Sequence, residues 1–469
     1  MSTFSGLGTA ASALAAARRG MDVVGQNIAN QATEGYTRQR VDTSAIAAAR
    51  LSTRFSVGAA PGHGVAVDGI TRLGDALLDA RVRESSSSAG FWSARALAAT
   101  TAETAMSEPS EHGLAARLSK FWAGWQDLAI APDSGAAASV VLESAAQLSA
   151  QIAGGYRSVA TQWSDTRASA ERTVAQVNAT ATQIADLNAE IRDALASGRS
   201  ANEIIDRRDG LVQVAARLVG ARGTLEADGT MTVRIDGNAL VSGDSARSLT
   251  LDGPMSMGEN GRMTVSWSGA AGFPVAVDGG ELGGMLSVLA PAADGGTLAG
   301  IAESYSAVAT ALAEMVNAQH RQGETATGQP GGDFFTLSTT GPAALGLGLA
   351  VHDASDLALA SAGGGPLDAG NANAISEIGR NALSPDARWT GAVGAFAVST
   401  AGDIQRARLS DAAAVTAVTA QRSVAAVDGD EETISLLTYQ SAYQAAARVL
   451  TAVDESLDVL INRTGLVGR

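Results

Sequence analysis

Cysteine is absent from the 469-residue sequence, so the chain has no disulfide framework, no thiolate nucleophile and no cysteine-ligated metal. Aromatic residues make up only 4% of it, which argues against a compact enzyme with a large apolar pocket. Lys120 is the single lysine, and acidic residues exceed basic ones by 48 to 33, for a net charge of -15. This charge repels polyanions, so nucleic acid and anionic membranes are poor candidate partners.

Long hydrophobic runs are also absent. The sequence contains no stretch of about eighteen consecutive apolar residues, and its start lacks the basic and continuous apolar regions of a secretory signal peptide. We therefore expect a chain that does not insert into a membrane and is not exported by the Sec pathway. Its length exceeds that of an ordinary single core and indicates roughly two to four domains.

Residue types that often carry catalysis or bind metal are scattered. The four histidines, His63, His112, His320 and His352, lie far apart, with no second histidine three or four positions away. The glycine runs continue into neither a phosphate-binding loop nor a dinucleotide fingerprint. We therefore predict no catalytic residue, no metal site and no cofactor.

Two further clusters have structural interpretations that are more common than the functional ones. The run Ser85 to Ser88 lacks the glycines of a nucleophile elbow and is interpreted as a polar turn or the start of a helix. Trp122 and Trp125 lie three residues apart and could stack on a sugar, although packing of one helix against its neighbour is the commoner outcome. Neither cluster predicts an enzyme.

Both ends of the chain carry apolar residues at helical spacing. An interrupted stripe covers residues 4–28, and a continuous heptad-like stripe follows the acidic residues 428–432. Two such helices can pair as an antiparallel coiled coil and pack against copies of themselves, although the interrupted stripe predicts a weak pair in the free monomer. The expected subunit-assembly residues are Phe4, Leu7, Leu14, Met21, Ile28, Leu436, Tyr439, Tyr443, Leu450, Val453, Leu457 and Leu460.

Between the ends, helical and strand patterns alternate. Apolar spacing predicts a long helix or helical hairpin over about 136–195, in which Asn188 interrupts the apolar face. Further helices are predicted over 282–322 and 400–426. Because helical segments stand on both sides of a strand-rich segment, we expect the two halves of the chain to share helical domains.

The strand-rich segment is centred on a hairpin signal. Residues 224–235 alternate with period two around the turn Asp228-Gly229. The predicted fold is mainly α, with discontinuous domains, terminal helices paired as a coiled coil and a small β-rich insert. The expected domains are 1–48 with 429–469 as a terminal coiled-coil assembly domain, 49–220 with 281–428 as a helical bundle, and 221–280 as the β-rich insert.

Several motifs resemble those of bacterial flagellar axial proteins. Gly25-Gln26-Asn27-Ile28-Ala29-Asn30 followed by Gly35-Tyr36-Thr37-Arg38-Gln39 is similar to an N-terminal signature of rod, hook and first hook-associated proteins. Leu436-Leu437-Thr438-Tyr439-Gln440-Ser441-Ala442-Tyr443 resembles the C-terminal helix of hook-filament junction proteins. Internal stretches such as Asp206-Arg207-Arg208-Asp209-Gly210-Leu211 extend the resemblance over most of the chain. It is weakest in the β-rich insert and over 340–400.

The resemblance to the flagellar hook-associated protein 1 family implies a structural, non-enzymatic subunit at the hook-filament junction, required for filament assembly. It implies export by the flagellar type III apparatus without a cleaved signal peptide, and an extracellular location. Implied partners are copies of the chain, the hook protein, the third hook-associated protein and a cytoplasmic export chaperone at the C-terminal helix. The signature also adds Asn27 and Asn30 to the assembly residues, with capping or turn-setting roles at the end of the first helix.

Two alternatives remain open. A flagellar hook or rod subunit would share the N-terminal signature, although the pattern Tyr439-Gln440 and Tyr443-Gln444 and the long helical region before residue 200 favour the junction protein. A secreted cell-wall enzyme on a flagellar scaffold would need a constellation of catalytic residues that the sequence does not show. A cell-wall digestion assay distinguishes that class.

Overall fold

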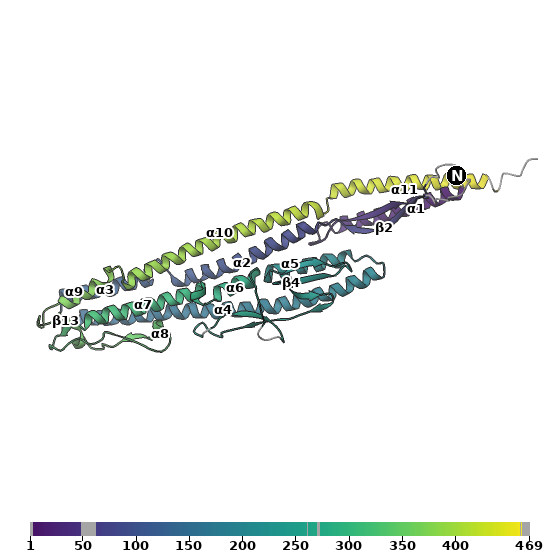
Figure 1. Cartoon of the computed structure of the whole chain (residues 1–469). Helices are drawn as coiled ribbons and strands as arrows, with labels where there is room; N and C mark the ends of the chain where they lie inside the picture. Colours follow the sequence, from purple (N-terminus) through teal and green to yellow (C-terminus); the bar gives the residue numbers. More distant parts are fainter. Residues whose placement is uncertain (1–2, 48–61, 260, 270–272, 460, 462–469) are drawn as a thin grey trace, which may run out of the picture.

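Long helices that run along one common axis give the molecule an elongated shape (Figure 1). The computed structural model describes residues 3–47, 62–259, 261–269, 273–459 and 461. Its helices are α1 (Thr3–Ala29), α2 (Ala76–Met106), α3 (Leu114–Ile130), α4 (Gly135–Ala196), α5 (Asn202–Val219), α6 (Gly280–Leu289), α7 (Thr297–His320), α8 (Ala343–Gly346), α9 (Gly370–Ser376), α10 (Pro385–Ala425) and α11 (Gly429–Asp458). The predicted mainly helical fold with paired terminal helices is confirmed.

Short antiparallel sheets lie between the helices. The strands are β1 (Gln39–Ala45), β2 (Val65–Arg72), β3 (Arg222–Leu225), β4 (Met231–Ile235), β5 (Asn238–Ser242), β6 (Ser245–Ala246), β7 (Leu249–Asp252), β8 (Thr264–Trp267), β9 (Pro274–Val275), β10 (Gly323–Thr325), β11 (Phe335–Leu337), β12 (Leu347–Leu349) and β13 (Ala358–Ser361). The sheets have the orders β1-β2, β3-β4-β5-β6, β7-β8-β9, β10-β13 and β11-β12.

The β-rich insert forms where the sequence predicts it. Strands β3 to β9 fall within 221–280, and β3 pairs with β4 across a turn in which Gly229 has a φ of +85°, a conformation that suits glycine. Strands β10 to β13 are a correction, because the helical bundle was expected to continue there. At three or four residues each, they are too short to leave an alternating pattern in the sequence.

The helix α4 is the longest and central helix of the bundle. The hydroxyl of Ser134 caps its first turn by accepting from the amide of Ala137. One face is fully buried from Leu148 and Ile152 through Val177 to Ile191, so the long helix predicted over 136–195 is confirmed as one continuous element. It packs against α3, α5 and α7, and it carries the β-rich insert at its C-terminal half.

Asparagine side chains on α4 and α7 fasten strands to the helices. In each case the amide nitrogen donates to the carbonyl of the strand's first residue, and the amide oxygen accepts from the N–H of that same residue. Asn188, which interrupts the predicted apolar face, is fully buried for this reason. The pairs are Asn178 with Leu249 of β7, Asn188 with Met231 of β4, and Asn317 with Phe335 of β11.

The helix α2 corrects the interpretation of Ser85 to Ser88 as a turn or a helix start. These serines lie inside α2, and Ser86 is buried. A Cβ atom on the nearby Gly90 would lie 2.4 Å from the carbonyl oxygen of Arg217 on α5. Small side chains are therefore required on this face because the backbone of a neighbouring helix approaches closely.

The helix α10 begins earlier than the predicted residue 400. The hydroxyl of Ser384 accepts from the amide of Ala387, and Pro385 occupies the first turn. Both signals are present in the sequence, but the glycines that follow obscure the apolar period. Trp389 in the second turn is buried against Tyr305 of α7, with ring centroids 4.7 Å apart.

Aromatic side chains pack at the bundle end that lies far from the chain termini. Trp125 is buried, and its ring centroid lies 5.3 Å from that of Phe334. Trp122 donates its indole N–H to Asp386 on α10 at 2.8 Å. The predicted helix-packing role of the two tryptophans is confirmed. Across the described residues, no helix combines the length and hydropathy needed to cross a membrane.

Candidate assembly surface at the paired terminal helices

The helices α1 and α11 run in opposite directions along each other at one end of the molecule (Figure 1). A Cβ atom on Gly20 would lie 2.4 Å from the ring of Tyr439, so glycine at this position lets the helices approach. The facing pairs are Gly6 with Val453, Gly20 with Tyr439, and Asn27 with Glu432. The antiparallel pairing expected from the sequence is therefore present within one chain.

The predicted stripe of α11 lies on the side that faces α1. Ala446 in its middle is buried, whereas Tyr443 is 40% exposed. The other described members, Leu436, Tyr439, Leu450, Val453 and Leu457, are half-buried. The placement of Leu460 lies outside the described residues. A single partner helix therefore leaves much of this stripe in contact with water.

The stripe predicted for α1 lies beside the buried face rather than at its centre. Leu7, Leu14 and Met21 are half-buried, Ile28 is 39% exposed, and the side chain of Phe4 lies outside those described. A seven-residue repeat drifts around a straight α-helix, which carries these residues to the edge of the contact. The residues buried instead are Ala10, Ala17, Gly20, Val23, Val24 and Asn27.

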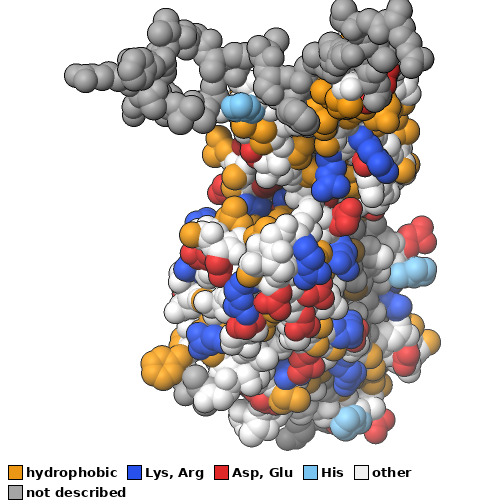
Figure 2. Space-filling view, turned by 90° about the vertical axis from the view of Figure 1, so that its right-hand side faces the viewer, with side chains coloured by type: hydrophobic (Ala, Val, Ile, Leu, Met, Phe, Trp, Pro, Cys, Tyr) orange, Lys and Arg blue, Asp and Glu red, His pale blue; other side chains and the backbone are white. Residues whose placement is uncertain are grey.

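The hairpin β1-β2 packs on α1 and belongs with the terminal helices. Its strands pair from Gln39 with Arg72 to Ala45 with Val65, on either side of the predicted domain boundary at residue 48. We call α1, β1, β2 and α11 the terminal unit. Figure 2 looks onto this end of the molecule, where hydrophobic side chains gather on the terminal unit at the top and charged side chains intersperse on the bundle below.

Asn27 joins three segments of the terminal unit. Its amide nitrogen donates to the carbonyl of Gln39 at 2.9 Å and to Glu432 at 3.0 Å, and its amide oxygen accepts from the N–H of Gln39 and the hydroxyl of Tyr36. Its side chain is 1% exposed. Gln39 is the first residue of β1, so Asn27 fastens this strand as the three asparagines of the bundle fasten theirs.

Asn30 has the turn-setting geometry expected from the signature. Its amide donates to the carbonyl of Gln26, and its oxygen accepts from the hydroxyl of Thr33. These bonds lie at the exposed end of α1. The two signature asparagines therefore differ, because Asn27 is a buried connection between segments and Asn30 shapes a local turn.

Charged residues close the junction between the turn after α1 and the start of α11. The guanidinium of Arg38 contacts Glu431 at 2.6 Å and Glu432 at 2.7 Å. The main-chain N–H of Arg38 donates to the carbonyl of Ala425 at the end of α10. Glu432 is only 2% exposed, and a buried charge needs partners. Arg38 and the amide of Asn27 supply them. Sequence reasoning assigned the acidic residues to the start of a helix and did not predict their contact with Arg38, which lies inside a motif that carries the family resemblance.

A second set of charges ties the terminal unit to α5 of the bundle. Arg72 at the end of β2 contacts Asp206 at 2.6 Å and Asp209 at 3.1 Å, and Asp206 accepts from the N–H of Thr37. Asn202 donates to the side chain of Gln39. The run 206–211 noted in the sequence therefore presents two carboxylates, one turn apart, to the terminal unit.

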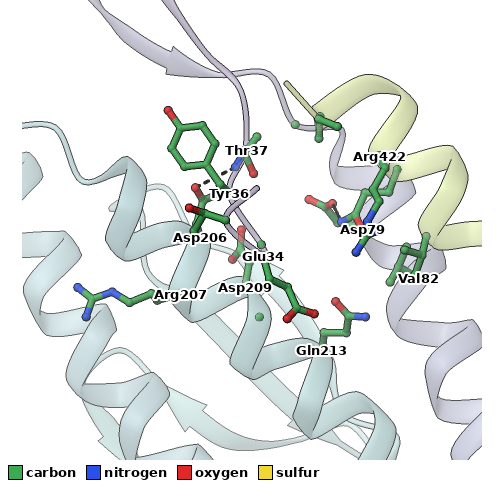
Figure 3. A pocket seen from close by; sticks show the side chains of 18 of the residues that line it. Glu34, Tyr36, Thr37, Asp79, Val82, Asp206, Arg207, Asp209, Gln213 and Arg422 are labelled. Carbon is green, nitrogen blue, oxygen red and sulfur yellow. Dashed lines mark hydrogen bonds between the residues drawn. The ribbon is translucent and has the colours of Figure 1, made fainter. Parts of the chain in front are cut away.

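A cleft of about 990 Å³ lies beside this junction (Figure 3). Asp206, Asp209 and Gln213 of α5 line one wall, and Asp79 and Arg422 lie on the opposite side. Burial, followed by the nearby carboxylates of Asp206, Glu203 and Glu432, raises the pKa of Tyr36 to about 12, so its hydroxyl stays protonated and can donate to Asn27. Among the described residues, no group of three or more His, Asp or Glu side chains is placed to hold a metal ion.

Comparisons with known proteins first define the class. Residues 7–37 match the family described as flagella basal body rod protein, and residues 423–463 match the C-terminal family of the flagellar basal body rod FlgEFG proteins. These two matches cover most of α1 and all of α11, the helices that pair. The terminal unit is thus that of a flagellar axial protein.

The helical bundle identifies the particular family. Residues 99–335 match the flagellar hook-associated protein FlgK helical domain, and the chain belongs to this family of structural flagellar proteins. Flagellar hook-associated protein 1 of Bacillus subtilis is 27% identical over the whole of both chains. That of Salmonella typhimurium is 28% identical over 70% of this chain and 59% of its own. The flagellar hook junction protein FlgK from Burkholderia pseudomallei shares the fold, with a TM-score of 0.63 at 16% identity over 73% of this chain and 100% of its own.

Proposed function

We propose that this chain is a non-enzymatic structural subunit at the junction between the flagellar hook and the filament, and that filament assembly requires it. The observation that carries the proposal is the combination, in one chain, of the hook-associated helical domain with rod-type terminal segments that pair as α1 and α11. The half-buried stripe of α11 supports an assembly role, because contacts with further subunits would bury it completely.

The same proposal includes the route and the partners of the protein. The chain leaves the cell through the flagellar type III apparatus, without a cleaved signal peptide, and becomes part of the extracellular flagellum. There it contacts copies of itself, the hook protein and the third hook-associated protein, and before export a cytoplasmic chaperone binds its C-terminal helix. The net charge of -15 fits a protein that binds neither nucleic acid nor anionic membranes, and no cofactor is part of the proposal.

Electron microscopy of a strain that lacks this chain tests the function. We expect hooks without filaments, with flagellin lost to the medium. The alternative role as a hook or rod subunit has support of its own, since both terminal matches are to rod-type families. In that case the deletion removes the hook itself. Normal filaments would rule out both roles.

Substitutions on α11 test the assembly surface. Leu450→Asp or Leu457→Asp places a carboxylate in the stripe, and burying an unpaired charge against apolar partners costs several kcal/mol. We expect either variant to be lost from isolated hooks while the bundle stays folded. Leu97→Asp is the matched control, because Leu97 on α2 is 70% exposed. Incorporation of all three variants at equal levels would contradict the proposed surface.

A further inference from the structure

Sulfur in this chain belongs to methionine alone, because cysteine is absent from the sequence. The nine methionines are unequally accessible, and Met1 lies outside the described residues. Met255 is 65% exposed, whereas Met106, Met231 and Met263 are buried. Those with half-buried side chains are Met21, Met257, Met285 and Met315. Among the described methionines, a dissolved oxidant therefore reaches Met255 most readily.

Met255 lies in the loop that follows β7, and local bonds hold its main chain in place. The N–H of Met255 donates to the carboxylate of Glu259 at 2.9 Å, and the hydroxyl of Ser256 donates to the same carboxylate at 3.1 Å. The preceding residue, Pro254, is buried. Met255 therefore has a defined position on the surface of the β-rich insert.

Arg167 of α4 connects this loop to the bundle. Its Nε donates to the carbonyl of Pro254 at 3.0 Å, and its Nη1 pairs with Glu171, one turn along α4, at 3.0 Å. Its Nη2 contacts the sulfur of Met255 at 2.9 Å. The side chain of Arg167 is only 12% exposed, and a thioether is a weak hydrogen-bond acceptor. Nη2 is therefore held at Met255 without a strong acceptor there.

Oxidation by a peroxide converts this sulfur into a strong acceptor. A lone pair of the sulfur attacks one peroxide oxygen, so an S–O bond forms and the O–O bond breaks. The sulfur loses two electrons and the peroxide is reduced, because the departing oxygen takes up the proton of the transferred oxygen and leaves as water. The product, methionine sulfoxide, carries a polar oxygen on the atom that Nη2 of Arg167 already contacts. Hydrogen bonds from a charged guanidinium are roughly twice as strong as those between neutral groups.

The same reaction has a different effect at the buried methionines. Met106, Met231 and Met263 belong to the apolar core of the bundle. A sulfoxide at one of these positions places a polar oxygen inside that core, which costs free energy and disrupts the packing. Met255 is thus the described methionine at which oxidation meets the least resistance and does the least damage.

We propose that Met255 is a site of oxidation by peroxides, and that Arg167 binds the resulting sulfoxide and thereby fastens the loop after β7 more tightly to α4. In both the reduced and the oxidised protein, Asn178 of α4 holds the start of β7 through its bonds to Leu249. Oxidation therefore adds a strong attachment at the end of this strand to the one at its start. The inference goes beyond the proposed function and does not depend on it.

Hydrogen peroxide applied to the purified full-length chain tests the reactivity of Met255. Mass spectrometry of the digested protein measures the oxidation rate of each methionine. We expect Met255 to be oxidised roughly tenfold faster than the three buried methionines. Fragmentation of the peptide that contains both Met255 and Met257 distinguishes these two residues. Equal rates at exposed and buried methionines, or faster oxidation of Met257, overturn the proposal.

Hydrogen exchange at a peroxide dose that oxidises Met255 alone tests the role of Arg167. Peptides covering 253–259 should exchange about threefold more slowly after oxidation, because the sulfoxide binds the guanidinium more strongly than the thioether does. In Arg167→Gln this difference should disappear. In the matched control Arg172→Gln it should remain, because Arg172 is exposed on the same helix and bonds to Ser169.

The variant Met255→Leu shows whether the effect belongs to this sulfur. Leucine is not oxidised by peroxide, so the exchange of 253–259 in this variant should be the same before and after treatment. Unaltered or faster exchange after oxidation of the unmodified protein overturns the proposal. Slowing of the same size in Arg167→Gln or in Met255→Leu overturns it as well.

Discussion

Replacing Asn27 by alanine should loosen the start of β1 while the bundle stays intact. The substitution leaves the buried N–H and carbonyl of Gln39 without the partners they have at 3.0 and 2.9 Å. An unsatisfied buried polar group costs about 1–3 kcal/mol, and Glu432 keeps its contact with Arg38, so the local free energy of opening should fall by about 2–4 kcal/mol.

Hydrogen exchange followed by mass spectrometry measures this change at the Gln39 amide. A loss of 2–4 kcal/mol corresponds to exchange that is roughly 30- to 700-fold faster in peptides covering 36–45, with peptides from α4 unchanged. Asn30→Ala is the control, because its bonds lie at the exposed end of α1 and its effect should stay below about threefold. Equal exchange in the two variants would refute the role assigned to Asn27.

Three further predictions concern the junction, the bundle and the terminal pair. Arg72→Gln removes the contacts of Arg72 with Asp206 at 2.6 Å and with Asp209 at 3.1 Å, so small-angle X-ray scattering should report a wider range of angles between the terminal unit and the bundle. Arg40→Gln is the control, because Arg40 is exposed and should leave the scattering curve unchanged. Equal curves for the two variants would contradict the role of Arg72 in holding the terminal unit to the bundle. Burial lowers the pKa of His320 below 6.5, against weaker opposing effects of the Gly332 carbonyl and Asp333, so the unfolded state binds the proton more readily. The stability contributed by neutral His320 is present above pH 6.5 and is lost as the pH falls below that value. Between pH 7.5 and 5.5 the melting temperature should therefore drop less in His320→Phe than in the unmodified protein. Equal drops in the two proteins would contradict a contribution of neutral His320 to stability. In the free monomer, amides of α1 and α11 away from the Asn27 contact should exchange faster than those of α4, and equal protection would mean that the pair is stable without neighbours.

Sequence reasoning succeeded where a long, regular pattern decides the structure. The buried face of α4 repeats over its whole length, and both terminal helices were found from their apolar stripes. It failed where small residues form the contact, because Ala10 and Ala17 of α1 are buried while Leu7 and Leu14 lie at the edge. Small residues are also the reason why α2 was not predicted. Its serines permit a close helix contact, but a run of serines in a sequence is typical of a turn.

The charged junction could not be predicted for a different reason. Arg72 meets Asp206 across more than 130 residues of sequence (from 72 to 206), and neither residue shows in its local pattern that it has a partner. Polar pairs of this kind follow from the tertiary arrangement alone. The family resemblance included Asp206 and Arg38 in its motifs, which indicated that these residues matter without indicating what they contact.

The asparagines that fasten strands determine which substitutions the strand attachments tolerate. Each amide binds both the main-chain N–H and the carbonyl of the first residue of β1, β4, β7 or β11, and each helix comes before its strand along the chain. The helix therefore fixes where the strand begins, whatever side chain stands there. Substitutions at the four strand starts leave the attachment intact, whereas replacing an asparagine, even by aspartate, removes the donor that holds the strand carbonyl. The sequences of the attached strands can therefore vary between relatives, while the positions along the helices at which the strands are attached stay the same.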